Sequence, residues 1–206
     1  MGQHFLSKIA VSLDDFCDDY KNNAMNYLWW LKSKYPTFRV TLFSIPARIS
    51  LSGGYLVGQN SNWMQLAVHG WNHDHEEVAA WDEARCNQVL DDAEKMGIFV
   101  KGFKAPNWAM TDVMRKVLLD RGYWLAEHHD NHDHVANNFP KLRLYCLCNP
   151  LCMHGHTWDL PNKELEFRNG IRQWIEERGL PFNEDTEFLF VDELFNPPSV
   201  TSWMTK

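Results

Sequence analysis

Residues 65–75 have the sequence Gln65-Leu-Ala-Val-His69-Gly-Trp-Asn-His73-Asp-His75. An apolar run typical of a strand ends here in two histidines four residues apart, and a long polar segment with helical periodicity follows. In α/β folds, functional groups collect at the carboxyl ends of parallel strands. Because neutral imidazole nitrogens bind Zn, Fe, Ni and Co, His69 and His73 can share one metal ion. The stretch therefore predicts a metal site at a strand end, which a carboxylate must complete.

Short apolar runs alternate with amphipathic stretches on both sides of this segment. The apolar runs predict strands at Ser7–Leu13, Phe38–Ile45, Met64–Val68, Phe99–Phe103, Tyr123–Ala126, Leu142–Cys148 and Glu187–Val191, with a short apolar step at Leu151–Met153. Helical spacing predicts helices at Asn23–Lys34, Glu76–Met96, Asp112–Asp120 and Asn162–Arg178, and a loop is expected at Arg48–Ser61. Strands that alternate with helices imply a parallel sheet. About seven strands favour an α/β fold of the distorted (β/α) barrel type. An open doubly wound sheet is the alternative, but no glycine-rich nucleotide motif follows a strand.

Size, charge and composition exclude several classes of protein. At 206 residues, the chain fits one domain spanning residues 1–206, since a single core usually takes about 100–250 residues. A formal charge of -7 and the lack of a lysine/arginine run argue against nucleic acid as a partner. No apolar run approaches the roughly 20 residues of a membrane span. The amino-terminal residues show no signal-peptide pattern, and the five cysteines show no disulfide-framework spacing, so a cytoplasmic or unknown location in a reducing compartment is expected.

Reactive residues recur at the ends of four predicted strands, and this recurrence strengthens each of them. They are Asp14-Asp15, His69/His73, Lys104-Ala-Pro106 and His154. One carboxylate with two imidazoles makes a three-ligand site with open positions, which is typical of a hydrolytic metal centre. The other aspartate of the pair can then accept a proton from water, and a histidine can donate one to the leaving group. His154, and His156 two residues later, are the candidates for this histidine.

The same residues resemble the motifs of the polysaccharide deacetylases, a family with the NodB-homology fold (carbohydrate esterase type 4). Ser12-Leu-Asp14-Asp15 resembles the T-F-D-D motif, and His69-Gly-Trp-Asn-His73 resembles H-S/T-x-x-H. Lys104-Ala-Pro106 stands where the family has R-x-P, and Cys152-Met-His154 resembles L-x-H. The run FLFVDEL at residues 188–194 looks like the final strand of the family. The motifs occur in the family's order over nearly the whole chain.

The resemblance implies a zinc-type hydrolase built on a distorted barrel. A divalent metal, most commonly Zn2+, would be bound by Asp15, His69 and His73. Asp14 would be the base and His154 the acid in removing N-acetyl groups from an amino sugar or polysaccharide. The residues expected to contact this carbohydrate, or a small amide in its place, are Trp71, Lys104, Pro106, Asn107 and Trp108.

The chain also departs from the family pattern. Lys104 replaces an arginine, and an ammonium group cannot reproduce a bidentate guanidinium fork. Gly70 stands where the family has Ser or Thr, and Phe16 where it has Gly. The family's late D-x-x-D-W motif is not visible. Two alternatives therefore stay open: a non-catalytic carbohydrate-binding relative, and a hydrolase of the same fold that acts on a small amide.

Two clusters of possible ligands have a simpler structural interpretation. The run HHDNHDH at residues 128–134 is expected to be a polar loop, with a role beside the metal or an independent metal site as alternatives. Cys146, Cys148 and Cys152 are expected to be small core residues, and a zinc cluster is the alternative. His75 is expected at the surface.

Overall fold

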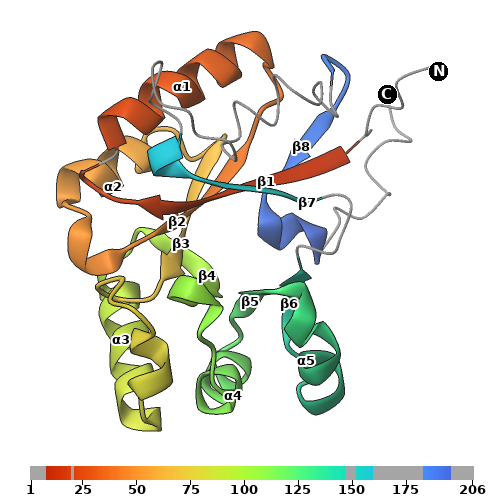
Figure 1. The fold of residues 1–206 in the computed structure, drawn as a ribbon. Coiled ribbons are helices and arrows are strands. Elements are labelled where there is room, and N and C mark those ends of the chain that lie inside the picture. Colours follow the sequence, from red (N-terminus) through yellow and green to blue (C-terminus); the bar gives the residue numbers. More distant parts are fainter. Residues whose placement is uncertain (1–7, 20, 147–151, 160–182, 196–206) are drawn as a thin grey trace.

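The structure, a computed structural model, describes residues 8–19, 21–146, 152–159 and 183–195, and its centre is a curled parallel sheet (Figure 1). The strand order is β6-β5-β4-β3-β2-β1-β7, and β8 pairs with β1. The strands are β1 (Lys8–Phe16), β2 (Val40–Ser44), β3 (Met64–His69), β4 (Phe99–Lys104), β5 (Trp124–Glu127), β6 (Arg143–Cys146), β7 (Cys152–His156) and β8 (Glu187–Leu189). All of these pairings are parallel. The predicted distorted (β/α) barrel is therefore confirmed, as a half-barrel.

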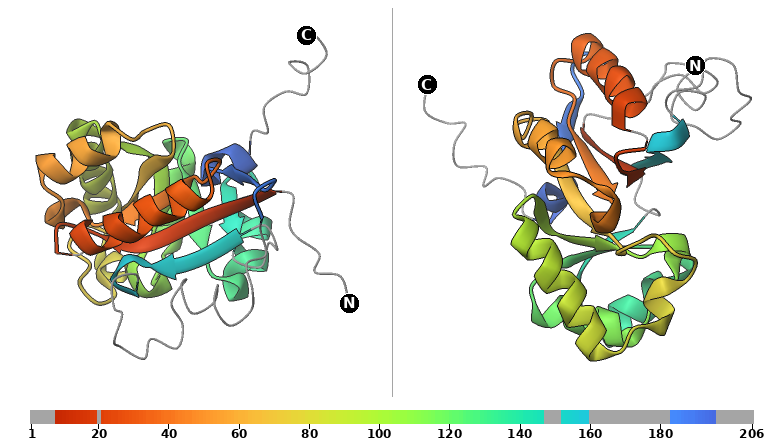
Figure 2. Two further views of the ribbon diagram at one scale, coloured as in Figure 1. Left: turned by 90° about the horizontal axis from the view of Figure 1, so that it is seen from above. Right: turned by 90° about the vertical axis from the view of Figure 1, so that its left-hand side faces the viewer.

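The helices cover the outer face of the curled sheet in two groups (Figures 1 and 2). They are α1 (Lys21–Lys34), α2 (Leu51–Gly58), α3 (Glu83–Met96), α4 (Asp112–Asp120) and α5 (His132–Asn138). Every second residue of a strand points outward, so Val40 and Leu42 of β2 join α1 in one apolar cluster. Phe103 and Leu125 pack with α3 and α4 in a second cluster. None of the described helices is long and apolar enough to cross a membrane.

The intervening residues point to the inner, concave face. Phe43, Ala67 and Trp124 form a small apolar cluster there. Gly102 of β4 is required by this packing, because a Cβ at this position would lie 2.1 Å from the Trp124 ring. The same alternation places polar side chains inward at the carboxyl ends of the strands: Asp14 on β1, His69 on β3, Lys104 on β4, and His154 and His156 on β7.

Several predicted elements differ from the structure. The predicted loop Arg48–Ser61 contains helix α2. Ser50 is the N-cap of this helix and accepts a hydrogen bond from Gly53 N. The helix predicted at Glu76–Met96 begins at Glu83 instead, since Asp82 is its N-cap. The HHDNHDH run is not a polar loop but a 3-10 turn, His129–Asn131, followed by α5. Cys146, expected to be a core thiol, is disulfide-bonded. The predicted helix Asn162–Arg178 lies outside the described residues.

Candidate active site

An irregularity at the end of β1 brings two consecutive aspartates to the inner face. The predicted strand ends at Leu13, but β1 continues through Phe16, and its register against β2 shifts between these residues. Asp15 takes a left-handed backbone conformation with φ 64° in this bulge. Both Asp14 and Asp15 thereby face the same site, which ordinary strand alternation does not allow.

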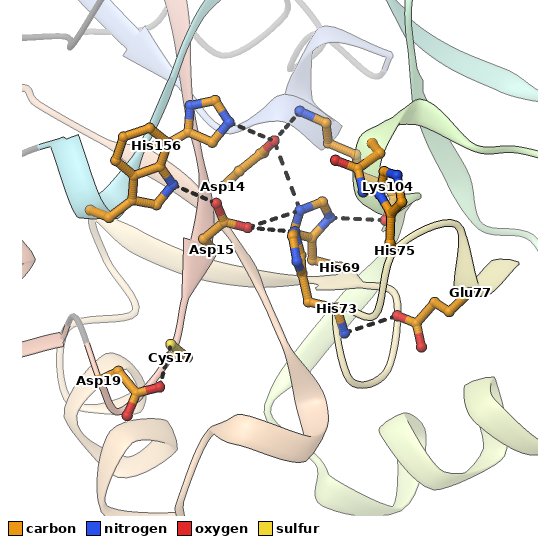
Figure 3. Close-up of polar contacts among 12 residues, drawn as sticks. Asp14, Asp15, Cys17, Asp19, His69, His73, His75, Glu77, Lys104 and His156 are labelled. Carbon is orange, nitrogen blue, oxygen red and sulfur yellow. Dashed lines mark hydrogen bonds and ion pairs between the residues drawn. The ribbon is translucent and has the colours of Figure 1, made fainter. Parts of the chain in front are cut away.

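Asp15, His69 and His73 converge on one point (Figure 3). Asp15 Oδ1 lies 2.9 Å from His73 Nε2 and 3.3 Å from His69 Nε2. One candidate ligand atom from each residue lies within 4.8 Å of the other two. His69 Nδ1 is 3.1 Å from the Lys104 carbonyl oxygen, so Nδ1 donates this hydrogen bond and Nε2 keeps its lone pair. The structure thus brings together the three residues expected to bind a metal.

The environment of Asp15 fits a divalent cation. Its Oδ1 is buried, and no donor among the described residues makes a well-aligned hydrogen bond with it. Oδ2 accepts a 2.7 Å hydrogen bond from Trp158 Nε1. Burial by itself would raise the pKa of Asp15, but His69 and His73 lower it well below its usual range. A buried carboxylate oxygen that faces two imidazole nitrogens without a well-aligned hydrogen bond is costly, and a cation between Asp15 and the two imidazoles removes that cost.

Glu77 holds the loop that carries His73. Its Oε1 accepts hydrogen bonds from Trp71 N at 2.8 Å and His73 N at 3.0 Å, and its Oε2 accepts one from Asn72 N at 3.2 Å. His73 itself has φ 64°, a strained conformation for a non-glycine residue. Sequence reasoning missed Glu77, because a glutamate in a polar segment carries no distinctive signal.

Gly70 is also explained by this loop. It has φ 62°, and a Cβ there would lie 2.2 Å from Glu77 Oε1 and 2.6 Å from Pro106 Cγ. A serine or threonine at this position has no room beside the Glu77 carboxylate. The departure from the family pattern at residue 70 is therefore coupled to the presence of Glu77.

Asp14 is buried beside the metal-binding triad and contacts Lys104 directly. Lys104 Nζ donates to Asp14 Oδ2 and also lies 3.7 Å from the centre of the Trp108 ring. Burial by itself would raise the pKa of Asp14, but Lys104, followed by the surrounding histidines, lowers it to about 2. The carboxylate is therefore ionised, and its buried Oδ1 has no hydrogen-bond donor among the described residues. Lys104 thus provides one charged contact where the family pattern has a guanidinium fork.

Both histidines of β7 lie next to Asp14. The register of β7 against β1 pairs Ser12 with His154 and Asp14 with His156. His154 Nε2 is 3.5 Å from Asp14 Oδ2, and His156 Nε2 is 4.0 Å from the same oxygen. The His156 ring packs on the Trp158 ring with centroids 5.0 Å apart.

A cavity of about 310 Å³ opens over these groups. The residues that line it are Asp14, Asp15, His69, His73, Lys104, Asn107, Trp108, His156 and Trp158. Two of the residues expected to contact substrate, Trp71 and Pro106, do not line the cavity. Pro106 is buried. Trp158 was not anticipated from the sequence, because its position depends on the pairing of β7 with β1.

The HHDNHDH segment lies beside the cavity rather than in it. His128 packs edge-on against Trp108 with ring centroids 5.6 Å apart, and His134 Nε2 lies 2.8 Å from Asp112 Oδ1. His75 is exposed, as expected, and its Nδ1 is 2.8 Å from Asn107 Nδ2.

Comparison with known proteins shows the fold. No family model matches the sequence, and no curated protein matches it. Among solved structures, a family 4 acetyl xylan esterase from Clostridium thermocellum in complex with a cobalt ion is 15% identical, with a TM-score of 0.57 over 92% of this chain and 91% of that chain. The chitin deacetylase of the fungal pathogen Colletotrichum lindemuthianum is 12% identical, with a TM-score of 0.56 over 92% and 87%. A family 4 pseudoenzyme from Bacillus anthracis is 11% identical, with a TM-score of 0.54 over 89% and 69%.

Proposed function

We propose that this chain is a metal-dependent hydrolase that removes N-acetyl groups from an amino sugar or polysaccharide. The observation that carries the proposal is the buried Asp15 Oδ1, which faces the Nε2 atoms of His69 and His73 without a well-aligned hydrogen bond. An ionised second carboxylate and two imidazoles stand beside this triad, which gives six groups that hydrolysis of an amide can use. The fold, shared with an acetyl xylan esterase and a chitin deacetylase, supports the same reaction class.

Separate residues would bind the metal, accept a proton and donate a proton during amide hydrolysis. When bound by Asp15, His69 and His73, a divalent metal such as Zn2+ supplies activation of water and polarisation of the acetyl carbonyl. Asp14 accepts the proton of the attacking water through Oδ1, the atom left without a hydrogen bond. Lys104 keeps Asp14 ionised and fixes its other oxygen. Both histidines of β7 lie next to Asp14 and therefore close to the bond that breaks. One of these imidazoles gives a proton to the departing nitrogen.

Two features favour specific alternatives. Lys104 in place of the family's arginine, together with the pseudoenzyme of the same fold, favours a non-catalytic carbohydrate-binding protein. The cavity of about 310 Å³ is at the small end of ligand sites, roughly 300–1,000 Å³, and favours a small amide as substrate. Acetate release separates these alternatives from the main proposal.

The test is acetate release from N-acetylglucosamine oligomers and from a panel of small acetamides, with zinc present. We expect release by the wild type and a loss of about 10²-fold or more in Asp14→Asn, whose side chain has the same shape but cannot take up the proton. Asp14→Asn keeps all three metal ligands, so its metal content should equal that of the wild type. Release from the acetamides alone would identify the small-amide hydrolase. A wild type that binds the oligomers and releases no acetate from any substrate would contradict the proposal in favour of the binding protein.

A further inference from the structure

We infer that His156 is the catalytic imidazole that donates a proton to the leaving group, and that His154 is a positioning residue for Asp14 and Lys104. This assignment rests on the proposed amide hydrolysis. The motif resemblance points instead to His154 as the acid. The two rings lie side by side on the same face of β7, with centroids 5.3 Å apart, so their surroundings decide between them.

Both ring nitrogens of His154 face other protein groups. Nε2 lies 3.2 Å from Lys104 Nζ, and Nδ1 lies 3.4 Å from Ser12 Oγ. Nε2 lies closer to Lys104 Nζ than to Asp14 Oδ2, which is 3.5 Å away. An ammonium group carries donors and no acceptor, so in the shorter contact Nε2 accepts from Lys104 and carries no proton. The proton of the ring then sits on Nδ1, which faces Ser12 and not the site.

The electrostatics agree with this neutral form of His154. Burial lowers the pKa of His154 to about 3; Lys104 adds to this effect, and Asp14 opposes it. The ring is 17% exposed and is not among the residues that line the cavity. His154 therefore stabilises the Lys104–Asp14 contact but has no proton to offer a substrate.

His156 differs from His154 in its exposure to the cavity. Its side chain is 38% exposed and lines the cavity together with Asp15 and His73. Its Nε2 points toward Asp14 Oδ2 at 4.0 Å, as Figure 3 shows, and its ring packs on Trp158. Trp158 is held in turn by its hydrogen bond to Asp15 Oδ2. The imidazole is thus oriented by the same aspartate that belongs to the metal-binding triad.

The assignment gives a balanced reaction. The water oxygen bonds to the acetyl carbon, and the carbon–nitrogen bond breaks. Asp14 takes one proton from the water, and His156 transfers its Nε2 proton to the departing nitrogen, which leaves as an amine. The other product is acetic acid, which carries the second proton of the water and loses it to solvent as acetate forms. Solvent exchange through the cavity returns the proton from Asp14 to His156, so no further reactant is consumed.

The test compares His156→Gln with the matched variant His154→Gln on two substrates. An N-acetylglucosamine oligomer releases an amine, which needs a proton, whereas 4-nitrophenyl acetate releases a phenolate, which does not. We expect His156→Gln to lose at least about 100-fold more kcat/KM on the amide than on the ester. His154→Gln should lose similar factors on both substrates, because both need the base that His154 helps to position. Zinc content is measured for each variant, and equal contents exclude a collapsed site.

Three outcomes would overturn the assignment. Equal losses on the two substrates in His156→Gln would make His156 a positioning residue. A loss selective for the amide in His154→Gln would return the acid role to His154. If the wild type releases no acetate from the amide, the proposed function itself fails, and the acid role of His156 fails with it.

Discussion

Lys104 is the residue on which the charge balance of the site depends. Its side chain is 2% exposed, and its neighbours are Asp14, His154 and the Trp108 ring. An isolated ammonium or carboxylate cannot be buried at this depth without a large cost, so each of the two charges requires the other. Lys104 makes fewer hydrogen bonds than an arginine fork could, but its ammonium group is buried in contact with Asp14, His154 and the Trp108 ring.

Removal of this ammonium should destabilise the fold. We expect Lys104→Met to lower the free energy of unfolding by roughly 3–5 kcal/mol at pH 7, because the buried Asp14 carboxylate loses its partner. Lys101→Met is the matched control, since Lys101 lies on the same strand with an exposed side chain, and its loss should stay below about 1 kcal/mol. Urea unfolding of the metal-free proteins measures both values. Equal stability of the two variants would contradict the role given to Lys104.

The lowered pKa of Asp14 should make the free energy of unfolding depend on pH. Its pKa in the folded chain is about 2, below the ordinary value of 3.8, so the unfolded chain binds its proton at a higher pH. The stability from this group is therefore fully present above about pH 4 and is lost as the pH falls toward 2, a loss of roughly 2 kcal/mol. In Asp14→Asn this part of the pH dependence should disappear. Urea unfolding from pH 6 to 2 measures it, and parallel curves for wild type and variant would contradict the prediction.

At the scale of elements, the segment between β3 and α3 positions His73. Three backbone N–H groups of this segment donate to the single carboxylate of Glu77, and Gly70 leaves the space for it. Groups that orient a metal ligand typically contribute a factor of about 10–100 in metal affinity. The loop is therefore as much a part of the proposed metal site as the histidines themselves.

Substitution of Glu77 should weaken metal binding without unfolding the chain. We expect Glu77→Ala to raise the dissociation constant for zinc by about 10–100-fold, because His73 loses its fixed backbone. The neighbouring Glu76→Ala, at an exposed position outside the hydrogen-bond set, should change it by less than about threefold. Competition with a chromophoric zinc chelator measures the constants, and circular dichroism checks the fold. An unchanged affinity in Glu77→Ala would show that the loop is held by other contacts.

At the scale of the whole molecule, the order of strands assembles the site from distant segments. Asp14 and His156 are register partners although 142 residues separate them, and His69 is the register partner of Lys104. The left-handed backbone at Asp15 and His73 turns both side chains toward the same point. Because the sheet is parallel and curled, the carboxyl ends of β1, β3, β4 and β7 meet on the concave face.

The sequence predicts those parts of this arrangement that depend on local patterns. Alternation of apolar runs and helical spacing predicts a parallel sheet of the distorted (β/α) barrel type, which the structure shows as a half-barrel. Strand-end residues predict a metal site of His69, His73 and one carboxylate, and the motif resemblance points to Asp15 as that carboxylate; the structure brings these three residues together. Contacts that depend on tertiary pairing could not be predicted: the bonds of Glu77, the packing of Trp158, and the different surroundings of His154 and His156. Helix α2 was missed because Gly53-Gly54 is typical of a loop, yet both glycines are buried in this helix, where a Cβ at Gly53 would lie 2.9 Å from Ile49 and one at Gly54 2.9 Å from Ile98.

The most direct test of the account is the zinc content of the purified chain after equilibrium dialysis against zinc, measured for the wild type, Asp15→Ala and His73→Ala. We expect about one zinc ion per wild-type chain and a loss of this ion in both variants, since each removes one of three ligands. Circular dichroism confirms that the variants are folded. A folded wild type that binds no zinc, or variants that bind it as tightly as the wild type, would contradict the metal site on which the proposed function depends.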